Sequence, residues 1–114
     1  MIRSSGSVSY EIRDDFMVIH IGGEIDHHSA VSVRTEVDEQ ITAHRPKRVL
    51  LELSRVDFMD SSGLGLIMGR YALMQRYGGT LAVLDPSAAV LRIITLAGMD
   101  RMISVLRTKQ KNDA

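Results

Sequence analysis

Alternation of apolar and polar residues near the start of the sequence predicts a β-hairpin. Every second residue is apolar from 8 to 13, which is the pattern of a strand with one buried face. Two aspartates at 14–15 separate this segment from a nearly continuous apolar run at 16–21. Strand-like runs joined by so short a polar break favour a hairpin. The glycine pair at 22–23 is expected to end the second strand.

Three later segments have the period of an α-helix, because their apolar residues recur three or four positions apart. The expected ranges are about 29–43, about 62–77 and 86–97. Asp26 or Ser29 is expected to cap the first helix with its side-chain oxygen. For the third, Asp85 is the expected cap and Pro86 lies in the first turn, where proline is tolerated.

The apolar runs between these helices predict three more strands, at 49–53, 80–84 and 102–106. The first of them is apolar on both faces, as is typical of a strand at the centre of a parallel sheet. Strands that alternate with helices indicate an α/β domain. We therefore predict a mixed, mainly parallel sheet of about five strands with three to four helices, and the hairpin adds an antiparallel edge.

Two packing details follow from the same pattern. In the connection after the central strand, at 54–60, Val56 and Phe58 are expected to anchor the chain to the core. Arg70 and Arg76 are expected on the solvated side of the second helix. The expected buried stripe of that helix consists of Leu64, Ile67, Met68, Tyr71 and Met74.

Length and composition narrow the class of protein. The 114 residues, 45% of them hydrophobic, suit one domain, expected to have its core at about 8–106 and flexible tails at 1–6 and 108–114. The formal net charge of +0 argues against a nucleic-acid partner. The absence of cysteine removes disulfides and thiol chemistry. The start lacks the apolar core of a signal peptide and no run suits a membrane helix, so we expect a cytoplasmic protein.

The densest chemical signal is Phe-Met-Asp-Ser-Ser-Gly-Leu-Gly at 58–65, between a predicted strand and a predicted helix. The first turn of a helix has free N–H groups that favour an anion, so a phosphate on Ser61 would be stabilised there. Gly63 and Gly65 are expected to leave the surface bare for an approaching enzyme. Spacing alone favours ordinary helix capping over a phosphorylation site, and both interpretations stay open at this point.

Other glycine-rich motifs do not fit this block. A dinucleotide fingerprint needs its third glycine where Met68 stands. A phosphate-binding loop needs a Gly-Lys pair, which the sequence lacks. An esterase elbow needs glycine where Met59 stands.

A second cluster, Gly-Glu-Ile-Asp-His-His at 23–28, contains two acids and two histidines. A metal site is one interpretation, but adjacent histidines point in different directions on a helix or strand. A triad of Ser61, His27 and Asp26 is another, although no oxyanion hole is evident. A capped helix start with exposed imidazoles and a partner-docking surface are the alternatives.

The blocks at 23–28 and 58–65, with the continuation through 69–71 to 78–79, resemble the anti-sigma factor antagonists, which belong to the STAS domain family. The similarity spans roughly 8–106. The Asp-Ser-Ser-Gly block is typical of the wider family, whereas the Asp-His-His block and the run through Arg-Tyr at 70–71 point to its sporulation members.

The resemblance implies a regulatory cycle in place of catalysis by this chain. An anti-sigma factor that is also an ATP-bound serine kinase holds a sigma factor inactive. The unphosphorylated antagonist binds that kinase and frees the sigma factor. The kinase then phosphorylates the first serine of the pair, which is Ser61 here, and a PP2C-type phosphatase restores the active form.

The resemblance also implies which residues meet the partner. It points to Glu24, Asp26, His27, His28, Asp60, Ser62, Gly63 and Leu64. It implies no cofactor, metal, nucleic acid or membrane, and it suggests a monomer. The family usually has a further C-terminal helix, for which only residues 107–114 remain here, so part of the sheet is expected to be less covered.

Two alternatives remain at this stage. The nearest is an antagonist of the general stress response, which differs only in its partner. The other is a small nucleotide-binding or hydrolytic enzyme that uses Asp26, His28 and Ser61.

Overall fold

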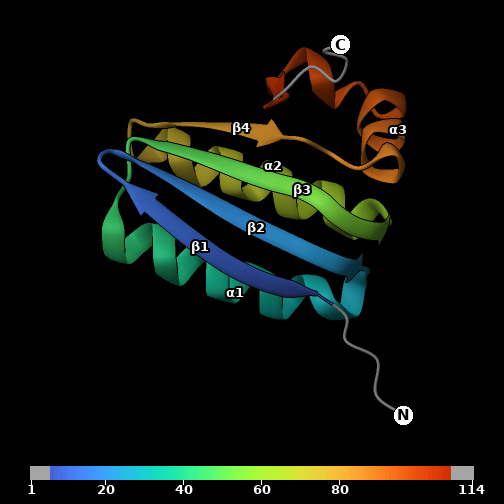
Figure 1. The fold of residues 1–114 in the computed structure, drawn as a ribbon, viewed down its shortest axis with the longest axis horizontal. Helices are drawn as coiled ribbons and strands as arrows, with labels where there is room; N and C mark the ends of the chain where they lie inside the picture. Colours follow the sequence, from blue (N-terminus) through green and yellow to red (C-terminus); the bar gives the residue numbers. More distant parts are fainter. Residues whose placement is uncertain (1–5, 109–114) are drawn as a thin grey trace.

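A five-stranded sheet forms the centre of residues 6–108, the part of the chain that the computed structural model describes (Figure 1). The elements in chain order are β1 (Ser7–Arg13), β2 (Phe16–Ile25), α1 (His27–His44), β3 (Arg48–Met59), α2 (Ser61–Arg76), β4 (Thr80–Leu84), α3 (Ala88–Leu96), the 3₁₀ helix η1 (Met99–Arg101) and β5 (Val105–Leu106). The tails predicted at the two ends of the chain lie mostly outside the described residues.

The strands lie in sequence order, β1-β2-β3-β4-β5, and only the β1–β2 pair is antiparallel. The carboxyl ends of β2, β3 and β4 therefore meet at one edge of the sheet, and the helices begin there (Figure 1). The predicted α/β class, the mainly parallel sheet and its antiparallel hairpin edge are confirmed. In residues 6–108, no helix is both long enough and apolar enough to cross a membrane.

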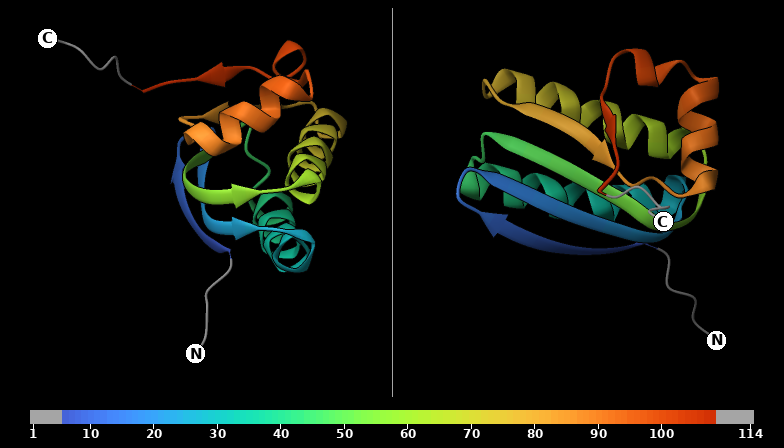
Figure 2. Two further views of the ribbon diagram at one scale, coloured as in Figure 1. Left: turned by 90° about the vertical axis from the view of Figure 1, so that its right-hand side faces the viewer. Right: turned by 45° about the horizontal axis from the view of Figure 1, so that its top comes forward.

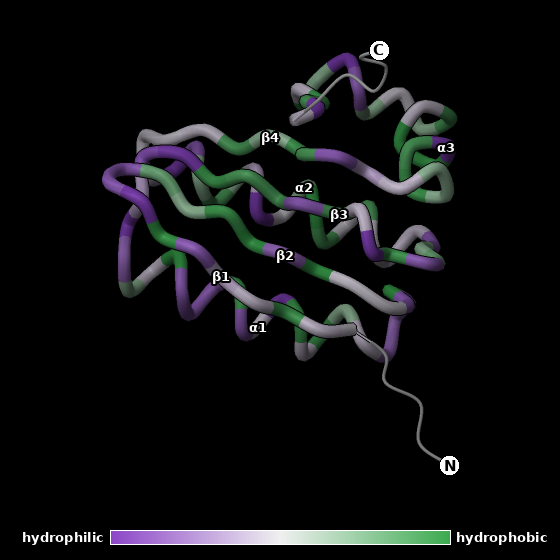
Figure 3. Tube along the Cα trace, in the orientation of Figure 1, coloured by the Kyte–Doolittle hydropathy of each residue, from purple (hydrophilic) through white to green (hydrophobic). Residues whose placement is uncertain are grey.

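The core lies between the sheet and the helix pair α1–α2, which cover one face together (Figure 2). Alternate residues of the central strands point into it. Figure 3 shows green apolar stretches along these strands. The fully buried side chains include Met17, Ile19, Val37, Ile41, Val49 and Leu51. On the opposite face, Phe16, Val18 and Leu50 are only half-buried.

The second and third strands are longer than predicted. The glycine pair at 22–23 lies within β2, because two register shifts against β3 absorb the irregularity instead of ending the strand. Gly23 has a φ of 88°, a left-handed conformation that suits glycine. β3 likewise continues past Leu53 to Met59 and includes the segment predicted as a connection.

Phe58 does not anchor the chain to the core, although Val56 does. Val56 pairs with Gly23 and Phe58 pairs with Glu24, so Asp57 is an extra residue in β3 at this point. The bulge reverses the alternation, and Met59 faces the core instead. Phe58 is 48% exposed.

The buried face of α2 differs from the predicted stripe. Its buried residues are Gly63, Leu66, Ile67, Arg70 and Met74. Ile67 and Met74 are as expected, whereas Leu64, Met68 and Tyr71 are only half-buried. Arg70 is buried rather than solvated, because its Nε lies 2.8 Å from Oδ1 of Asp38 on α1. Arg76 is exposed, as predicted.

Two helix starts also need correction. Asp26 caps α1, which begins at His27, slightly earlier than predicted. Ser87, not Asp85, caps α3 by accepting a bond from the backbone N–H of Val90. Asp85 has a φ of 48° and accepts instead from the backbone and hydroxyl of Thr108, so its carboxylate holds the end of β5.

Candidate functional site

The two chemical clusters found in the sequence lie side by side, because they follow neighbouring parallel strands. Ile25 at the end of β2 is the register partner of Met59 at the end of β3. The backbone N–H of Asp60 donates to the carbonyl oxygen of Ile25 at 3.2 Å. The starts of α1 and α2 are thereby held next to each other. We call the surface formed by their capping residues, Asp26 and Asp60, and the residues next to them the paired-cap face.

Asp26 forms the first cap of the paired-cap face. Its Oδ1 accepts hydrogen bonds from the backbone N–H groups of His28 and Ser29, each at 2.9 Å. The Ser29 hydroxyl accepts from the N–H of Asp26 and donates to the carbonyl oxygen of Glu24 at 2.7 Å. The bond from Ser29 and, to a smaller extent, that from His28 lower the pKa of Asp26. Asp26 is therefore a carboxylate at neutral pH.

Asp60 forms the second cap. Its Oδ1 accepts from the backbone N–H of Ser62 at 2.8 Å, and its carbonyl oxygen accepts from Gly63 at 2.9 Å. Ser61 is the first residue of α2 and is exposed. Within residues 6–108, the Ser61 hydroxyl has no hydrogen-bond partner. The hydroxyl is therefore open to another protein and adjoins the positive end of the helix dipole.

The two glycines that follow have different environments. Gly63 is buried, and a Cβ there would lie 2.2 Å from Cγ of Met59. Its absent side chain lets α2 pack closely on β3, so the expected bare surface at Gly63 is wrong. Gly65 is exposed, with nothing within 4 Å of a Cβ, so that part of the expectation is confirmed.

The remaining predicted residues surround these caps. His27 and His28 are exposed, with ring centroids 6.2 Å apart and planes inclined at 49°. Asp26 contacts backbone N–H groups, and no hydrogen bond in the described part of the chain joins it to His27 or joins His27 to Ser61. Nothing in residues 6–108 groups three acidic or histidine side chains as a metal site would. The geometry thus provides capping and an exposed surface instead of a catalytic triad.

One residue of this face was missed by the sequence reasoning. Phe58 is a large exposed aromatic side chain, and it is the register partner of Glu24. Exposed aromatic residues of this kind often dominate protein interfaces. The signal was its position directly before the Met-Asp-Ser-Ser motif, but its apolar side chain in an expected connection suggested an anchor to the core.

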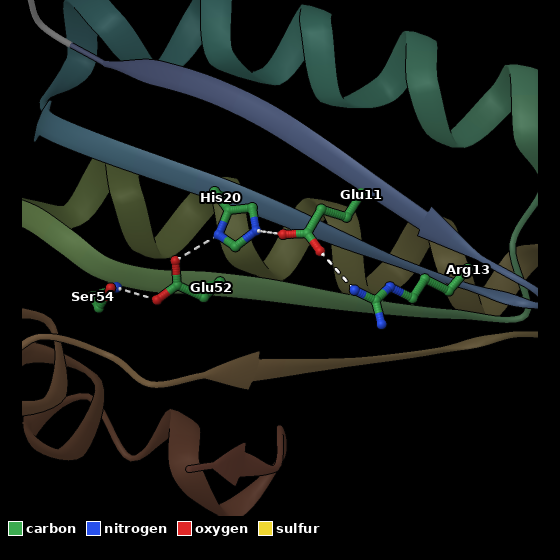
Figure 4. A network of polar contacts seen from close by, with 5 residues as sticks. All are labelled: Glu11, Arg13, His20, Glu52 and Ser54. Carbon is green, nitrogen blue, oxygen red and sulfur yellow. Dashed lines mark hydrogen bonds and ion pairs between the residues drawn. The ribbon is translucent and has the colours of Figure 1, made fainter. Parts of the chain in front are cut away.

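A separate polar cluster lies on the face of the sheet away from α1 and α2 (Figure 4). His20 on β2 bridges Glu11 on β1 and Glu52 on β3, with nitrogen–oxygen distances of 2.8 Å on both sides. The bond to Glu52 is the main cause that raises the pKa of His20; burial opposes it, and Glu11 adds to it. Burial acts to raise the pKa of Glu52, but bonds from Ser54 and His20 outweigh it, so the pKa is lowered. The cluster ties three strands together.

Comparison with known proteins gives a consistent result. The family model described as the STAS domain matches residues 7–112. An anti-sigma F factor antagonist from Paenibacillus polymyxa is 37% identical over 89 residues, which cover 78% of this chain and 76% of the relative. An anti-sigma-B factor antagonist from Bacillus subtilis is 26% identical over 99 residues, which cover 87% of this chain and 89% of the relative.

A solved structure is also similar in fold. The anti-sigma factor antagonist SpoIIAA in its unphosphorylated form superposes with a TM-score of 0.76 at 25% identity. The match covers 92% of this chain and 90% of that one.

Proposed function

The chain belongs to the STAS domain family, and we propose that it is an anti-sigma factor antagonist whose activity is set by phosphorylation of Ser61. In its unphosphorylated form it binds an ATP-bound anti-sigma factor that is also a serine kinase, and the bound sigma factor is released. In its phosphorylated form it no longer binds. The names of the relatives and the accessible serine at the start of α2 support this proposal.

The single observation that supports the switch most strongly is the placement of Ser61. A phosphoacceptor must present its hydroxyl to the active site of another protein, and Ser61 is exposed at the first position of a helix. Asp60 accepts the N–H of Ser62 and fixes the backbone on either side of this hydroxyl. The kinase therefore meets a rigid acceptor instead of a loop that must first be ordered.

We assign the partner contact to the paired-cap face. It comprises Glu24, Asp26, His27 and His28 around the first cap, Asp60, Ser62 and Leu64 around the second, and Phe58 beside them. Gly63 is buried and contributes indirectly, because it allows α2 to pack against Met59 and so positions the second cap. Phe58 supplies an exposed apolar side chain of the kind that protein interfaces use, and the neighbouring caps supply polar groups.

The modification step is a simple phosphoryl transfer. The Ser61 oxygen attacks the γ-phosphorus of ATP, the bond from that phosphorus to the ADP oxygen breaks, and the hydroxyl proton passes to a base of the kinase. The product has roughly −1.5 to −2 additional charge. This charge lies beside the carboxylate of Asp60 and must be desolvated in the complex, so binding weakens. A loss of roughly 3–4 kcal/mol corresponds to a few hundredfold in affinity, which is enough for a switch.

The cycle needs a phosphatase and a defined sigma factor. We propose a PP2C-type phosphatase, which returns Ser61 to its hydroxyl by hydrolysis, and a cytoplasmic location for all components. The relative with the higher identity is an anti-sigma F antagonist, which favours a role in sporulation. A role in the general stress response is the alternative, since an anti-sigma-B antagonist matches a larger share of the chain.

Titration calorimetry with purified anti-sigma factors tests this function. The unphosphorylated chain should bind one sporulation or stress anti-sigma factor in the presence of ATP analogue, and it should displace the sigma factor from that complex. If the unphosphorylated chain bound neither type of anti-sigma factor, the proposed function would be wrong.

A further inference from the structure

A groove runs between α1 and α2, next to the paired-cap face. Its volume is about 400 Å³, and its walls include His27 and Arg34 of α1 and Ser62, Gly65, Gly69 and Arg70 of α2. Ser62 follows the proposed phosphoacceptor directly, so the mouth of the groove adjoins Ser61. Any partner that reaches Ser61 therefore lies close to this groove.

Two glycines, Gly65 and Gly69, line the groove at positions where the fold itself does not require glycine. A Cβ at Gly65 or Gly69 would have nothing within 4 Å apart from the surrounding helix backbone. Neither residue has a positive φ, so neither needs glycine for its backbone conformation. Glycine inside a helix lowers stability relative to alanine. The fold thus contains two unfavourable glycines that no contact among the described residues requires, and together they leave room for an approaching chain.

The walls of the groove combine positive charge with the apolar side chains of Ala30, Val31 and Leu66. None of the residues that line it is acidic, and Arg34 is exposed there. Arg70 is 8% exposed; burial lowers its pKa, Asp38 acts to raise it, and the charge of Arg34 lowers it further. Its Nε pairs with Asp38 and its Nη1 donates a long bond of 3.5 Å to the carbonyl oxygen of Leu66. Among the described residues the guanidinium has no partner for its other N–H donors, and an anion in the groove would satisfy them.

We propose that this groove receives an acidic segment of the anti-sigma factor. Carboxylates of that segment pair with Arg34 and with the free donors of Arg70, and its backbone lies against Gly65 and Gly69. Charge complementarity selects an acidic occupant over a basic or purely apolar one. The inference rests on the proposed function and specifies how the partner is held.

This arrangement also explains why phosphorylation at Ser61 would release the partner. The new phosphate lies at the mouth of a groove that is occupied by the partner's carboxylates. The phosphate repels the partner's carboxylates, and it competes with them for the guanidinium groups of Arg34 and Arg70. Because salt screens these charge pairs, the affinity of the unphosphorylated chain for its partner should fall as the salt concentration rises. An interface built only on the apolar Phe58 would show a smaller fall.

The test is titration calorimetry of the wild-type chain and four variants against purified anti-sigma factors of the sporulation and stress types. Arg34→Glu places a negative charge in the groove, and Arg76→Glu makes the same change at an exposed position outside it. Gly69→Leu fills the groove, and Ala72→Leu adds a bulky side chain to the same helix away from it. Thermal unfolding of each variant is measured in parallel.

Arg34→Glu and Gly69→Leu should each weaken binding by about tenfold or more, while the two controls stay within about twofold of wild type. Gly69→Leu should unfold at the same or a higher temperature than wild type, because leucine is favoured over glycine in a helix. Equal affinity of all variants, with the wild type bound, would overturn the groove proposal and leave the proposed function intact. No binding by the wild type would overturn both.

Discussion

Nε of Arg70 lies 2.8 Å from Oδ1 of Asp38, so a guanidinium buried on α2 is paired with a carboxylate on α1. Both atoms are shielded from water. Their opposite charges and short distance make the contact an ion pair, although its angles do not meet those of a hydrogen bond. The side chain of Arg70 is 10% exposed and that of Asp38 is 36% exposed. The pair connects the two helices whose N-termini form the paired-cap face.

Replacement of the carboxylate in this pair should destabilise the fold. Asp38→Asn leaves the buried charge of Arg70 without a counter-ion, which typically costs roughly 3–5 kcal/mol in a fully buried pair. Because Asp38 is partly exposed, we expect a loss of about 2 kcal/mol in the free energy of unfolding. Urea denaturation measures it, with Glu39→Gln on the exposed side of α1 as the control. Equal stability of the two variants would show that the ion pair does not hold the helices.

The cap on α2 can be separated from the charge on the paired-cap face. Asp60→Asn preserves an oxygen that can accept the N–H of Ser62, and Asp60→Ala removes it. We expect Asp60→Ala to lose about 1 kcal/mol of stability and Asp60→Asn to stay close to wild type. Thermal unfolding measures both. A loss of stability in Asp60→Asn as large as that in Asp60→Ala would mean that the charge, not the cap, stabilises α2.

Gly63 and Gly65 should respond in opposite directions to the same substitution. Gly63→Ala forces a Cβ against Met59 in the core, and we expect a loss of about 1–3 kcal/mol. Gly65→Ala meets no neighbour and should gain roughly 0.5–1 kcal/mol from helix propensity. Equilibrium denaturation of both variants checks this. A loss at Gly65 equal to that at Gly63 would contradict the packing described here.

Much of the architecture follows from periodicity alone. The hairpin, the order of elements and the largely parallel sheet were predicted from alternation and from apolar runs, and the structure confirms them. The ends of β2 and β3 were not, because two register shifts between these strands, one of them the bulge at Asp57, let both strands continue past residues that usually terminate them. A bulge depends on how two strands pair, and no single strand's pattern reveals it.

Polar contacts between residues far apart in the sequence also could not be predicted. Arg70 was expected in water because its burial depends on Asp38, a residue on a different helix. Asp85 was expected to cap α3, but its carboxylate binds Thr108 near the end of the described chain. At the candidate site, the exposure of Ser61 and the capping by Asp26 follow the local sequence closely, whereas the groove beside them arises only when α1 and α2 pack.

The cluster at His20 predicts a pH dependence of stability. Its pKa is raised above the ordinary value of 6.5, so its stabilising contribution is complete below that value and is lost as pH rises through the folded-state pKa. The pKa of Glu52 is lowered below 4.5, so its contribution is complete above that value and is lost as pH falls through the folded-state pKa. Both contributions are therefore complete between these two ordinary values.

Thermal unfolding between about pH 5 and pH 9 tests this window. His20→Gln should lower the midpoint most near pH 5–6 in relation to wild type, and the difference should shrink as the pH rises above about 7. His44→Gln is the control, because among the described residues the His44 ring hydrogen-bonds to the carbonyl oxygen of Gln40 on its own helix and to no carboxylate. A difference that stays constant across the range would show that His20 acts through packing and not through its charge.

The central claim is tested most directly by intact-mass analysis after incubation with the anti-sigma factor kinase and ATP. Wild type and Ser62→Ala should each gain the mass of one phosphoryl group, peptide mapping should place it on Ser61, and Ser61→Ala should gain nothing. No mass gain in the wild type, or a phosphoryl group that maps to a residue other than Ser61, would contradict the account.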